Sequence, residues 1–319
     1  MSRRSDVLVV GSLNMDLVIR APRLPRPGET LHGHHFATVA GGKGANQAVA
    51  AARLGASVAM IGCVGNDAYG RQLRSALAAD GVDCAGVAVL PDVATGIASI
   101  IVDDQGQNSI TLVAGANAQV SAEFVDDFEA LLVAARVVVC QLEIPMATVG
   151  HVLGRARALG KIVILNPAPA VVPLPDGWLA NVDYLIPNET EAEALSGLPV
   201  NSPASARMAA LSLLERGAEK VLLTLGEAGV LVADHSAAEI FPAHAVEVRD
   251  STAAGDTFVG GFAAALAGGA KVLDAVAFAQ RAAGLSVMRE GAQTSIPTLA
   301  QVRSLESCSV KSCAPEQAQ

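Results

Sequence analysis

Aromatic residues are scarce in this chain, at 3% of its 319 residues, although hydrophobic residues of all kinds make up 51%. The core therefore has to be built mainly from Val, Leu, Ile and Ala. No apolar run reaches the roughly 18 residues that a membrane-spanning helix needs, and the longest, Phe258–Ala270, is rich in Gly and Ala. The first residues also lack the layout of a signal peptide. We therefore expect a cytoplasmic protein without a membrane anchor.

Positive charge is scarce as well. The chain has 22 Lys and Arg against 31 Asp and Glu, a net charge of −9, which argues against binding to nucleic acid or to an anionic membrane surface. Its five cysteines are an odd number, are widely spread and form no C-x-x-C pair. They indicate reduced thiols in the cytoplasm rather than disulfides or a zinc site. A small-molecule partner is the expectation that remains.

Two common nucleotide-binding patterns are missing. No G-x-G-x-x-G follows the first predicted strand, which disfavours a nicotinamide-dependent dehydrogenase. The segment 41–47 (Gly-Gly-Lys-Gly-Ala-Asn-Gln) resembles a phosphate loop, but a Walker motif needs Ser or Thr after its lysine, and Lys43 is followed by Gly44. Such a glycine run instead lets a small polar ligand approach the backbone closely. An ordinary loop-to-helix turn is an equal alternative.

Short apolar strands and helices alternate through most of the sequence. Strands are predicted at 7–11, 57–64, 137–142, 162–166, 184–187 and 220–225. Helices are predicted at 45–54, 69–80, 122–134, 147–159, 189–195 and 205–216. This alternation predicts an α/β fold with a mainly parallel central sheet flanked by helices. Because the chain has no repeat and no linker, we expect residues 1–303 to form one domain, with ligands beyond the carboxyl ends of the strands.

Two stretches break this alternation, at about residues 13–39 and 87–113. Turn signals there predict extended strands joined by turns. Within 96–102 both alternating faces are apolar, with Ile97 on one and Ile100 on the other, whereas a strand with one face in water should alternate more cleanly. Our hypothesis is a small β-sheet lid over the active site whose outer face contacts a second subunit in a homodimer; a buried hairpin is the alternative. The polar segment 304–319 is expected to be a loose tail.

Polar side chains follow two of the predicted strands. Asn14 and Asp16 come after the first strand and, being two residues apart, share a face of an extended chain. Glu143 follows the strand at 137–142. A carboxylate accepts hydrogen bonds from neighbouring hydroxyls, and an amide both donates and accepts, which suits a polyol. Each of these residues taken alone is also typical of a simple turn.

The segment 250–258 (Asp-Ser-Thr-Ala-Ala-Gly-Asp-Thr-Phe) indicates a tight turn that opens a helix of small residues. Gly255 is expected to permit the bend, with Asp256 and Thr257 where the helix begins. Unpaired N–H groups and the helix dipole make such a start an anion site. A carboxylate placed there can accept the proton of a hydroxyl that attacks a phosphate. The simpler interpretation is that Asp256 only caps the helix.

Two further segments follow later strands. Asn188-Glu-Thr-Glu191 fits a capping box, with Glu191 three residues after the capping Asn188. It fits equally a pair of oxygen donors for hydrated Mg²⁺. The segment 224–229 (Thr-Leu-Gly-Glu-Ala-Gly) carries glycines that permit the flat approach of a nucleotide.

Together, the segments 41–47 and 250–258 closely resemble the two signatures of the ribokinase family, a large family of sugar and nucleoside kinases related to B-type phosphofructokinase. Agreement extends over roughly residues 6–300, including Asn166-Pro-Ala-Pro169 and Gly291-Ala-Gln. The resemblance implies a ribokinase-like α/β domain with a β-lid that also forms the dimer contact. It further implies ATP-dependent phosphorylation of D-ribose at its 5-hydroxyl.

The resemblance also implies roles for individual residues. Catalysis would fall to Asp256 as the general base, with Gly255 and Ala254 beside it. The sugar would be held by Asn14, Asp16, Gly42, Lys43, Asn46, Glu143 and Asp256. The nucleotide would be bound by Asn188, Thr224, Gly226, Glu227, Gly229, Gly255 and Gln280. Mg²⁺ would be placed by Asn188 and Glu191, partly through water, and an activating K⁺ by Asp250, Thr252, Ser286, Arg289, Gly291 and Ser295.

Three alternatives stay open at this point. A kinase of the same family for another pentose, such as deoxyribose, or for a nucleoside would have an apolar contact in place of one hydroxyl contact. A sugar-binding regulator without catalysis is of a different class, and the presence or absence of turnover separates the two. A dehydrogenase is the weakest alternative, because the dinucleotide loop is missing.

Overall fold

Alternating side chains cover both faces of a large sheet in the computed structural model of the chain, which describes residues 6–311. In β1 (Val7–Val10), Leu8 and Val10 join one buried apolar cluster, and Val7 and Val9 join another on the opposite face. Strands that are buried on both faces require helices above and below the sheet. The predicted α/β architecture is confirmed.

The central sheet has nine strands in the order β13-β12-β11-β10-β9-β8-β1-β4-β5. After β1 they are, along the chain, β4 (Val58–Gly65), β5 (Asp83–Leu90), β8 (Val137–Cys140), β9 (Ile162–Leu165), β10 (Tyr184–Leu185), β11 (Val221–Thr224), β12 (Val230–Ala233) and β13 (Ala238–Phe241). Only the pairs β11–β12 and β12–β13 are antiparallel. Because β1 lies between β4 and β8, the winding direction reverses there, and α/β sheets bind ligands at such a point.

The helices form two layers. On one face lie α3 (Ala122–Asp126), α4 (Glu129–Ala134), α5 (Met146–Ala158), α6 (Glu189–Ser196) and α7 (Pro203–Glu215). On the other lie α1 (Lys43–Arg53), α2 (Ala68–Ala79), α8 (Ala254–Ala267), α9 (Val272–Ser286) and α10 (Leu299–Lys311). The single helix predicted at 122–134 is in fact two, since a short turn, in which the Phe128 amide donates to the Val125 carbonyl, separates α3 from α4.

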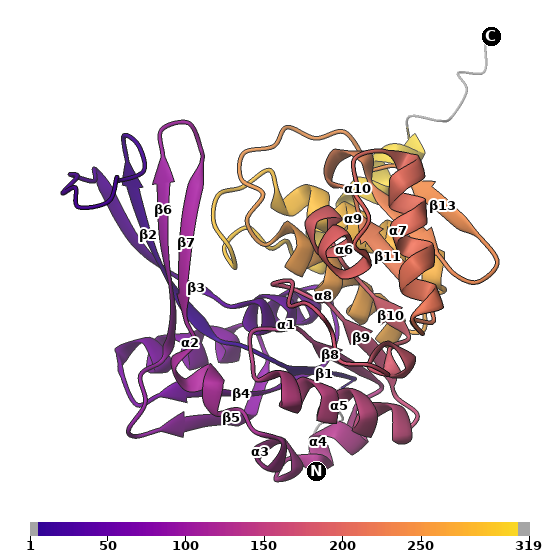
Figure 1. Cartoon of the computed structure of the whole chain (residues 1–319), viewed down its shortest axis with the longest axis horizontal. Coiled ribbons are helices and arrows are strands. Elements are labelled where there is room, and N and C mark those ends of the chain that lie inside the picture. Colours follow the sequence, from indigo (N-terminus) through magenta and orange to yellow (C-terminus); the bar gives the residue numbers. More distant parts are fainter. Residues whose placement is uncertain (1–5, 312–319) are drawn as a thin grey trace.

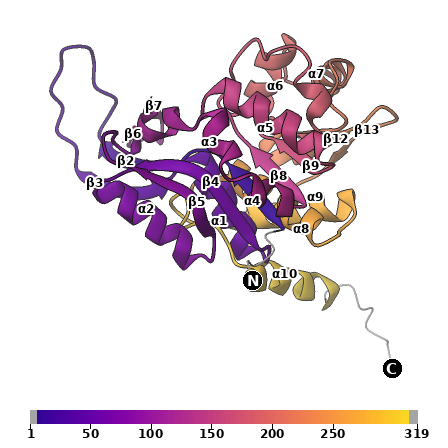
Figure 2. The same ribbon diagram turned by 90° about the horizontal axis from the view of Figure 1, so that it is seen from below.

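A second sheet of four strands, which we call the lid, projects from this body (Figure 1). It consists of β2 (Asn14–Ala21), β3 (His35–Gly41), β6 (Gly96–Asp103) and β7 (Asn108–Val113), in the order β3-β2-β6-β7. The connection between β2 and β3 extends beyond the strands as a long loop (Figure 2). The predicted lid segment 87–113 starts too early, because residues 87–90 belong to β5 and pair with β4 in the central sheet.

The prediction of a loose tail from residue 304 is also wrong in part. Helix α10 continues to Lys311, and the remaining residues 312–319 lie outside the described range. The helix is anchored because Val302 is fully buried against the α8–α9 layer. At its start the Gln301 side chain accepts a hydrogen bond from the Thr298 backbone N–H at 2.9 Å.

Two findings bear on the environment of the chain. Within residues 6–311, no helix is both long and apolar enough to cross a membrane. Cys63, Cys84 and Cys140 are free thiols. Burial raises the pKa of Cys63 to about 11 and that of Cys140 to about 12, so both thiols stay protonated at neutral pH.

Helices α1 and α8 pack unusually closely, and a glycine makes this possible. A Cβ atom on Gly260 would lie 2.5 Å from the Ala50 Cβ and 2.6 Å from the Gln47 carbonyl oxygen. Both neighbours are rigid parts of α1. The residue next along α8, Gly261, has more room, since its Cβ would lie 3.1 Å from a Leu54 methyl carbon and 3.4 Å from the Ala279 Cα.

We predict that Gly260→Ala destabilises the fold by about 1–3 kcal/mol, the usual cost of overpacking, despite the better helix propensity of Ala. Gly261→Ala is the matched control, because it brings the same gain in propensity while its nearest neighbour is a side chain that can move. Urea unfolding of both variants measures the difference. Equal stability of the two variants would contradict the close packing of α1 on α8.

Candidate active site

The polar residues that follow several parallel strands meet at one edge of the central sheet. β1 leads to Ser12, β8 to Glu143 and β9 to Asn166, while α1 and α8 begin at the same edge. Hydrogen bonds cross between these segments, as when the Ser12 hydroxyl donates to Glu143 at 2.6 Å. Ligands of α/β sheets bind beyond the carboxyl ends of the strands, so we expect the ligand site at this edge.

Asp256 stands in the first turn of α8 and is nearly buried, with 8% of its surface exposed. Its Oδ2 accepts a hydrogen bond from Asn46 Nδ2 and its Oδ1 accepts one from Gln47 Nε2, both at 2.9 Å. A buried carboxylate without such donors would be costly. Two bonds leave free lone pairs on a carboxylate, so Asp256 keeps the capacity to accept a proton.

The turn before α8 differs from the predicted one. The bend lies at Ala253, which adopts the left-handed conformation with φ 59°, and α8 already begins at Ala254. Gly255 is therefore inside the first turn, and a Cβ added there would have no heavy atom within 4 Å. A non-glycine residue in the left-handed region stores backbone strain, and such residues cluster at active sites. The open space over Gly255 leaves the N-terminus of α8 accessible to an anion.

The sugar-side residues form a second network around Glu143. Its Oε2 accepts from the Ser12 hydroxyl at 2.6 Å, from the Lys43 backbone N–H at 3.1 Å and from Asn14 Nδ2 at 3.4 Å. Gly42 makes this possible, because its φ is 89° and a Cβ there would lie 2.6 Å from the Asn14 backbone nitrogen. The predicted set Asn14, Gly42, Lys43 and Glu143 is thus brought together.

Charge is concentrated around these residues. The pKa of Asp16 is raised to about 7, first by burial and then by the nearby carboxylates of Glu143 and Asp256, while Lys43 opposes the shift. Burial disfavours the charged form of Lys43, yet attraction to four carboxylates leaves its pKa above the ordinary value. These are Asp256, Glu143, Glu191 and Asp16. One lysine thus sits among four acids, and the pocket itself carries excess negative charge.

A cavity of about 210 Å³ opens beside this cluster. Its wall contains Lys43, Asn166, Ala168, Ile186, Asn188, Glu191, Thr224, Ser251, Ala253, Ala254, Gly255, Asp256 and Val259. The cavity therefore joins the predicted base to part of the predicted nucleotide set. Since the start of α8 lines it, the cavity is suited to a phosphate group.

Asn188 and Glu191 form the predicted capping box at the start of α6. The Glu191 N–H donates to Asn188 Oδ1 at 2.8 Å, and the Asn188 N–H donates to Glu191 Oε2 at 2.9 Å. Both residues also line the cavity, so their role in the capping box does not exclude a role in binding Mg²⁺. Asn188 Nδ2 donates to the second oxygen of Glu191 at 3.1 Å, so each carboxylate oxygen accepts one hydrogen bond and keeps a lone pair for a water molecule.

The other residues that were predicted to bind the nucleotide do not all lie at the cavity. Thr224 lines the cavity, and Gly226 has open space around it. Gly229 has a structural role, because its φ is 102° and a Cβ there would lie 2.1 Å from the Phe241 carbonyl oxygen. Gln280 donates to that same oxygen at 2.8 Å, which ties α9 to β13. The exposed Glu227 is outside the cavity wall.

The predicted K⁺ residues lie on neighbouring segments. Asp250 accepts from the Thr252 hydroxyl and backbone N–H and, at 2.9 Å, from the Gly291 N–H. Ser286 and Ser295 are fully buried and donate to carbonyl oxygens of their own turns. These segments offer oxygen donors, the ligand type that a hard cation requires.

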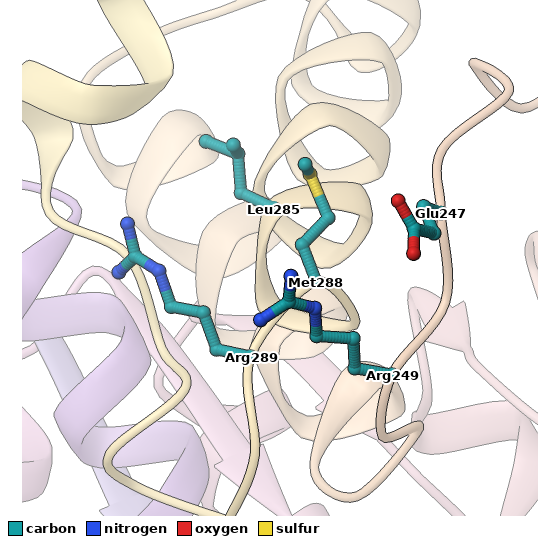
Figure 3. Close-up of a pocket in the computed structure, with 5 residues that line it drawn as sticks. All are labelled: Glu247, Arg249, Leu285, Met288 and Arg289. Carbon is teal, nitrogen blue, oxygen red and sulfur yellow. The ribbon is translucent and has the colours of Figure 1, made fainter.

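A second cavity, of about 230 Å³, lies between the loop after β13 and the end of α9. Arg249 extends from the first segment, and Met288 and Arg289 extend from the residues just after α9 (Figure 3). Glu247 and Leu285 complete its lining. None of its residues lines the cavity beside Asp256, although Arg289 also belongs to the predicted K⁺ set.

Comparison with known proteins agrees with this geometry. The family model described as pfkB family carbohydrate kinase matches residues 4–299. The ribokinase of Haemophilus influenzae is 43% identical over 295 residues, which cover 92% of this chain and 96% of that protein. The solved structure of Arabidopsis thaliana ribokinase complexed with ribose and ATP has a TM-score of 0.89 and 34% identity, covering 95% of this chain and 99% of that one. This chain belongs to the pfkB family of carbohydrate kinases.

Another relative of this carbohydrate kinase is named for a different sugar. The deoxyribokinase of Salmonella typhi is 36% identical over 296 residues, which cover 93% of this chain and 97% of that protein. Its identity is lower than that of the ribokinase from Haemophilus influenzae. Both relatives match nearly the full length of the kinase.

Sequence reasoning missed several residues that hold this kinase's site together. Asn117 donates to Asn14 Oδ1 at 2.8 Å, Gln47 donates to Asp256, and Gln141 donates to Gln47 Oε1 at 2.6 Å. Gln47 lies within the segment 41–47, so its position was a usable signal. Gln141 lies inside the strand predicted at 137–142, which in the structure ends at Cys140, and Asn117 lies between the predicted elements; neither gave a signal.

We predict that Asp16→Asn stabilises the kinase at neutral and alkaline pH. A raised folded-state pKa means that the stability linked to the Asp16 proton is present at acid pH and is lost as the pH rises from about 4 to about 7. The amide removes this loss, so the gain over wild type should grow across that range to about 2–4 kcal/mol. Thermal unfolding at pH 5 and pH 8 measures it, and a difference that does not change with pH would contradict the buried cluster.

Proposed function

We propose that this carbohydrate kinase is an ATP-dependent ribokinase, which phosphorylates D-ribose at its 5-hydroxyl to give D-ribose 5-phosphate and ADP. The observation that carries the proposal is the nearly buried Asp256, held by two amides at the start of α8 and beside the cluster of Asp16, Lys43 and Glu143. The relatives support the choice of sugar, since ribokinases of Haemophilus influenzae and Mus musculus are 43% and 44% identical, whereas deoxyribokinase is 36% identical.

The sugar is proposed to lie against Asn14, Asp16, Gly42, Lys43, Asn46 and Glu143. Asn46 supports this placement because it is 6% exposed and its Oδ1 has no hydrogen-bond partner. A buried acceptor of this kind is costly unless a ligand supplies the donor. A sugar hydroxyl would supply it, while the Asp16 carboxylate accepts from neighbouring hydroxyls.

Asp256 acts as the general base in this proposal. Asp256 takes the proton of the 5-hydroxyl as that oxygen forms a bond to the γ-phosphorus of ATP. The bond between the γ-phosphorus and the bridging oxygen breaks, and its electron pair leaves with ADP. Phosphoryl transfer depends mainly on positioning and charge stabilisation. Backbone N–H groups at Gly255 and Asp256, together with the Lys43 ammonium, supply positive potential to the migrating group.

The nucleotide is proposed to bind along Asn188, Thr224, Gly226 and Gly255, with Glu227, Gly229 and Gln280 acting at its edge. Because the pocket holds one lysine among four acids, cations have to balance the charge of the phosphates. Mg²⁺, held through water by Asn188 and Glu191, would neutralise phosphate charge when bound. An activating K⁺ would bind among Asp250, Thr252, Ser286, Arg289, Gly291 and Ser295. The free thiols fit the proposed cytoplasmic location.

An assay of ADP release across pentoses, hexoses and nucleosides, with and without K⁺, tests the function. We expect D-ribose to be the best acceptor and K⁺ to raise the rate. A preference for deoxyribose or a nucleoside would mean that the substrate is not ribose. Equal ADP release with and without a sugar would mean that ATP is hydrolysed rather than used to phosphorylate a sugar, which would contradict the proposed reaction. No turnover with any acceptor would favour the sugar-binding regulator.

In the same assay we predict that Asp256→Asn lowers kcat by about 10²–10⁴, the usual contribution of a general base. Ribose affinity should be largely kept, because the other sugar contacts remain. Isothermal titration of ribose into the variant measures that affinity. Near-wild-type turnover would remove Asp256 from its role.

A homodimer through the lid is proposed as well. The lid exposes four large apolar side chains: Phe36 (59%) and Val113 (53%) on the face opposite Asp16, and Ile110 (54%) and Leu112 (43%) on the face of Asp16, as the strand register places them. Several exposed apolar residues on one small sheet are typical of a protein contact.

We predict a dimeric mass by light scattering at micromolar concentration and a monomeric mass for Phe36→Asp. Val133→Asp is the control, because Val133 is similarly exposed (52%) but lies on α4, outside the lid. A monomeric wild type would contradict the lid contact.

A further inference from the structure

Gln47 is a fully buried polar residue between the two helices that carry the site. Its Nε2 donates to Asp256 Oδ1 at 2.9 Å and to Asn166 Oδ1 at 3.0 Å. Its Oε1 accepts from Gln141 Nε2 at 2.6 Å. Both N–H groups of Nε2 are therefore donated, and Oε1 accepts one hydrogen bond. The three partners lie on α8, directly after β8 and directly after β9.

The neighbours fix which way the Gln47 amide points. Asn166 Nδ2 donates to the Ile186 carbonyl at 2.8 Å, which turns Asn166 Oδ1 towards Gln47. Gln141 presents an N–H to the other side of Gln47. If the amide were reversed, its oxygen would face the oxygens of Asp256 and Asn166, and its N–H₂ would face the donor of Gln141. Such like-to-like contacts of buried groups are costly, so only the observed orientation is satisfied.

From this network we infer that Gln47 is a positioning residue for the general base, and that Gln141 acts through it. Gln47 holds one oxygen of Asp256 while Asn46 holds the other, so the plane of the carboxylate is fixed before the sugar arrives. The close packing of α1 on α8 at Gly260 sets the distance over which this contact is made. The inference rests on the proposed role of Asp256 as the base.

The consequence is a loss that appears in the chemical step and not in sugar binding. Without the Gln47 donor, Asp256 can rotate away from the attacking hydroxyl, and a small misplacement of a reacting group costs on the order of 10²-fold in rate. We therefore expect Gln47→Met, which keeps the length of the side chain, to lower kcat by about 10- to 100-fold. The dissociation constant of ribose should change less than threefold.

A double-mutant cycle separates positioning from a general structural effect. Gln47→Met is measured in the wild type and in Asp256→Ala, which has no carboxylate to position. If Gln47 acts through Asp256, its substitution changes kcat in the wild type but has little further effect in Asp256→Ala. Equal fold-losses in both backgrounds would overturn the inference.

Two further variants complete the experiment. Thr148→Val is the matched control, because Thr148 is also buried and loses a hydrogen bond, to the Val120 carbonyl at 2.7 Å, on the opposite face of the sheet. It should lose comparable stability while keeping kcat. Gln141→Met removes the donor that orients Gln47; we expect a smaller loss of kcat, absent in the Gln47→Met background. If Gln47→Met does not fold, Gln141→Met against Asp256→Ala provides the same cycle.

The outcomes distinguish this inference from the proposed function. An active Asp256→Ala would overturn the role of the base, and the positioning role with it. An inactive Asp256→Ala together with a wild-type kcat for Gln47→Met would overturn only the positioning role. Loss of ribose binding in Gln47→Met without loss of kcat would also overturn it, because Gln47 would then serve the sugar pocket.

Discussion

The carboxylate of Asp256 is nearly buried, and its burial is tolerable only because both of its oxygens accept hydrogen bonds from amides. Those amides stand on consecutive residues of α1, Asn46 and Gln47, while the carboxylate stands on α8. The contact therefore exists only where α1 and α8 approach closely, which Gly260 allows. The geometry of the base is thus a property of the packing of two helices.

A second constraint is the balance of charge around Lys43. Its ammonium lies near four carboxylates, and burial and the neighbouring acids push the pKa of Asp16 to about 7. A polyphosphate that enters such a pocket needs accompanying cations. The proposed ligands of these cations are Asn188, Glu191 and the oxygen donors around Asp250. The start of α8 contributes N–H groups rather than charge. The site is therefore organised to be completed by its ligands.

The sequence predicted six of the nine strands of the central sheet, because strands buried on both faces leave continuous apolar runs such as Val7–Val10, but not β5, β12 or β13. It also indicated that Asn14, Glu143 and Asn188 lie at one edge of the sheet, since they follow predicted strands and parallel strands end together. Less was predictable where long-range contacts decide. Residues 87–90 joined the central sheet through pairing with β4, and α10 formed because Val302 found a buried position.

Local sequence preference also misled in one place. A glycine favours a bend, and Gly255 was the expected one, yet the left-handed residue is Ala253. The side-chain network of Gln141, Gln47 and Asn166 connects residues that are about a hundred positions apart, and no local pattern indicates such a partner. The hydrogen bond from Gln280 to the Phe241 carbonyl oxygen, which ties α9 to β13, could not be predicted for the same reason.

In the proposed reaction, Asp256 receives a proton from the sugar while the two amides of α1 hold the carboxylate in place. A crystal structure with D-ribose and a non-hydrolysable ATP analogue would test this. We expect the 5-hydroxyl oxygen within about 2.6–3.2 Å of an Asp256 oxygen, with the bonds from Asn46 and Gln47 intact. A bound ribose whose 5-hydroxyl points away from Asp256, or that contacts no oxygen of this carboxylate, would contradict it.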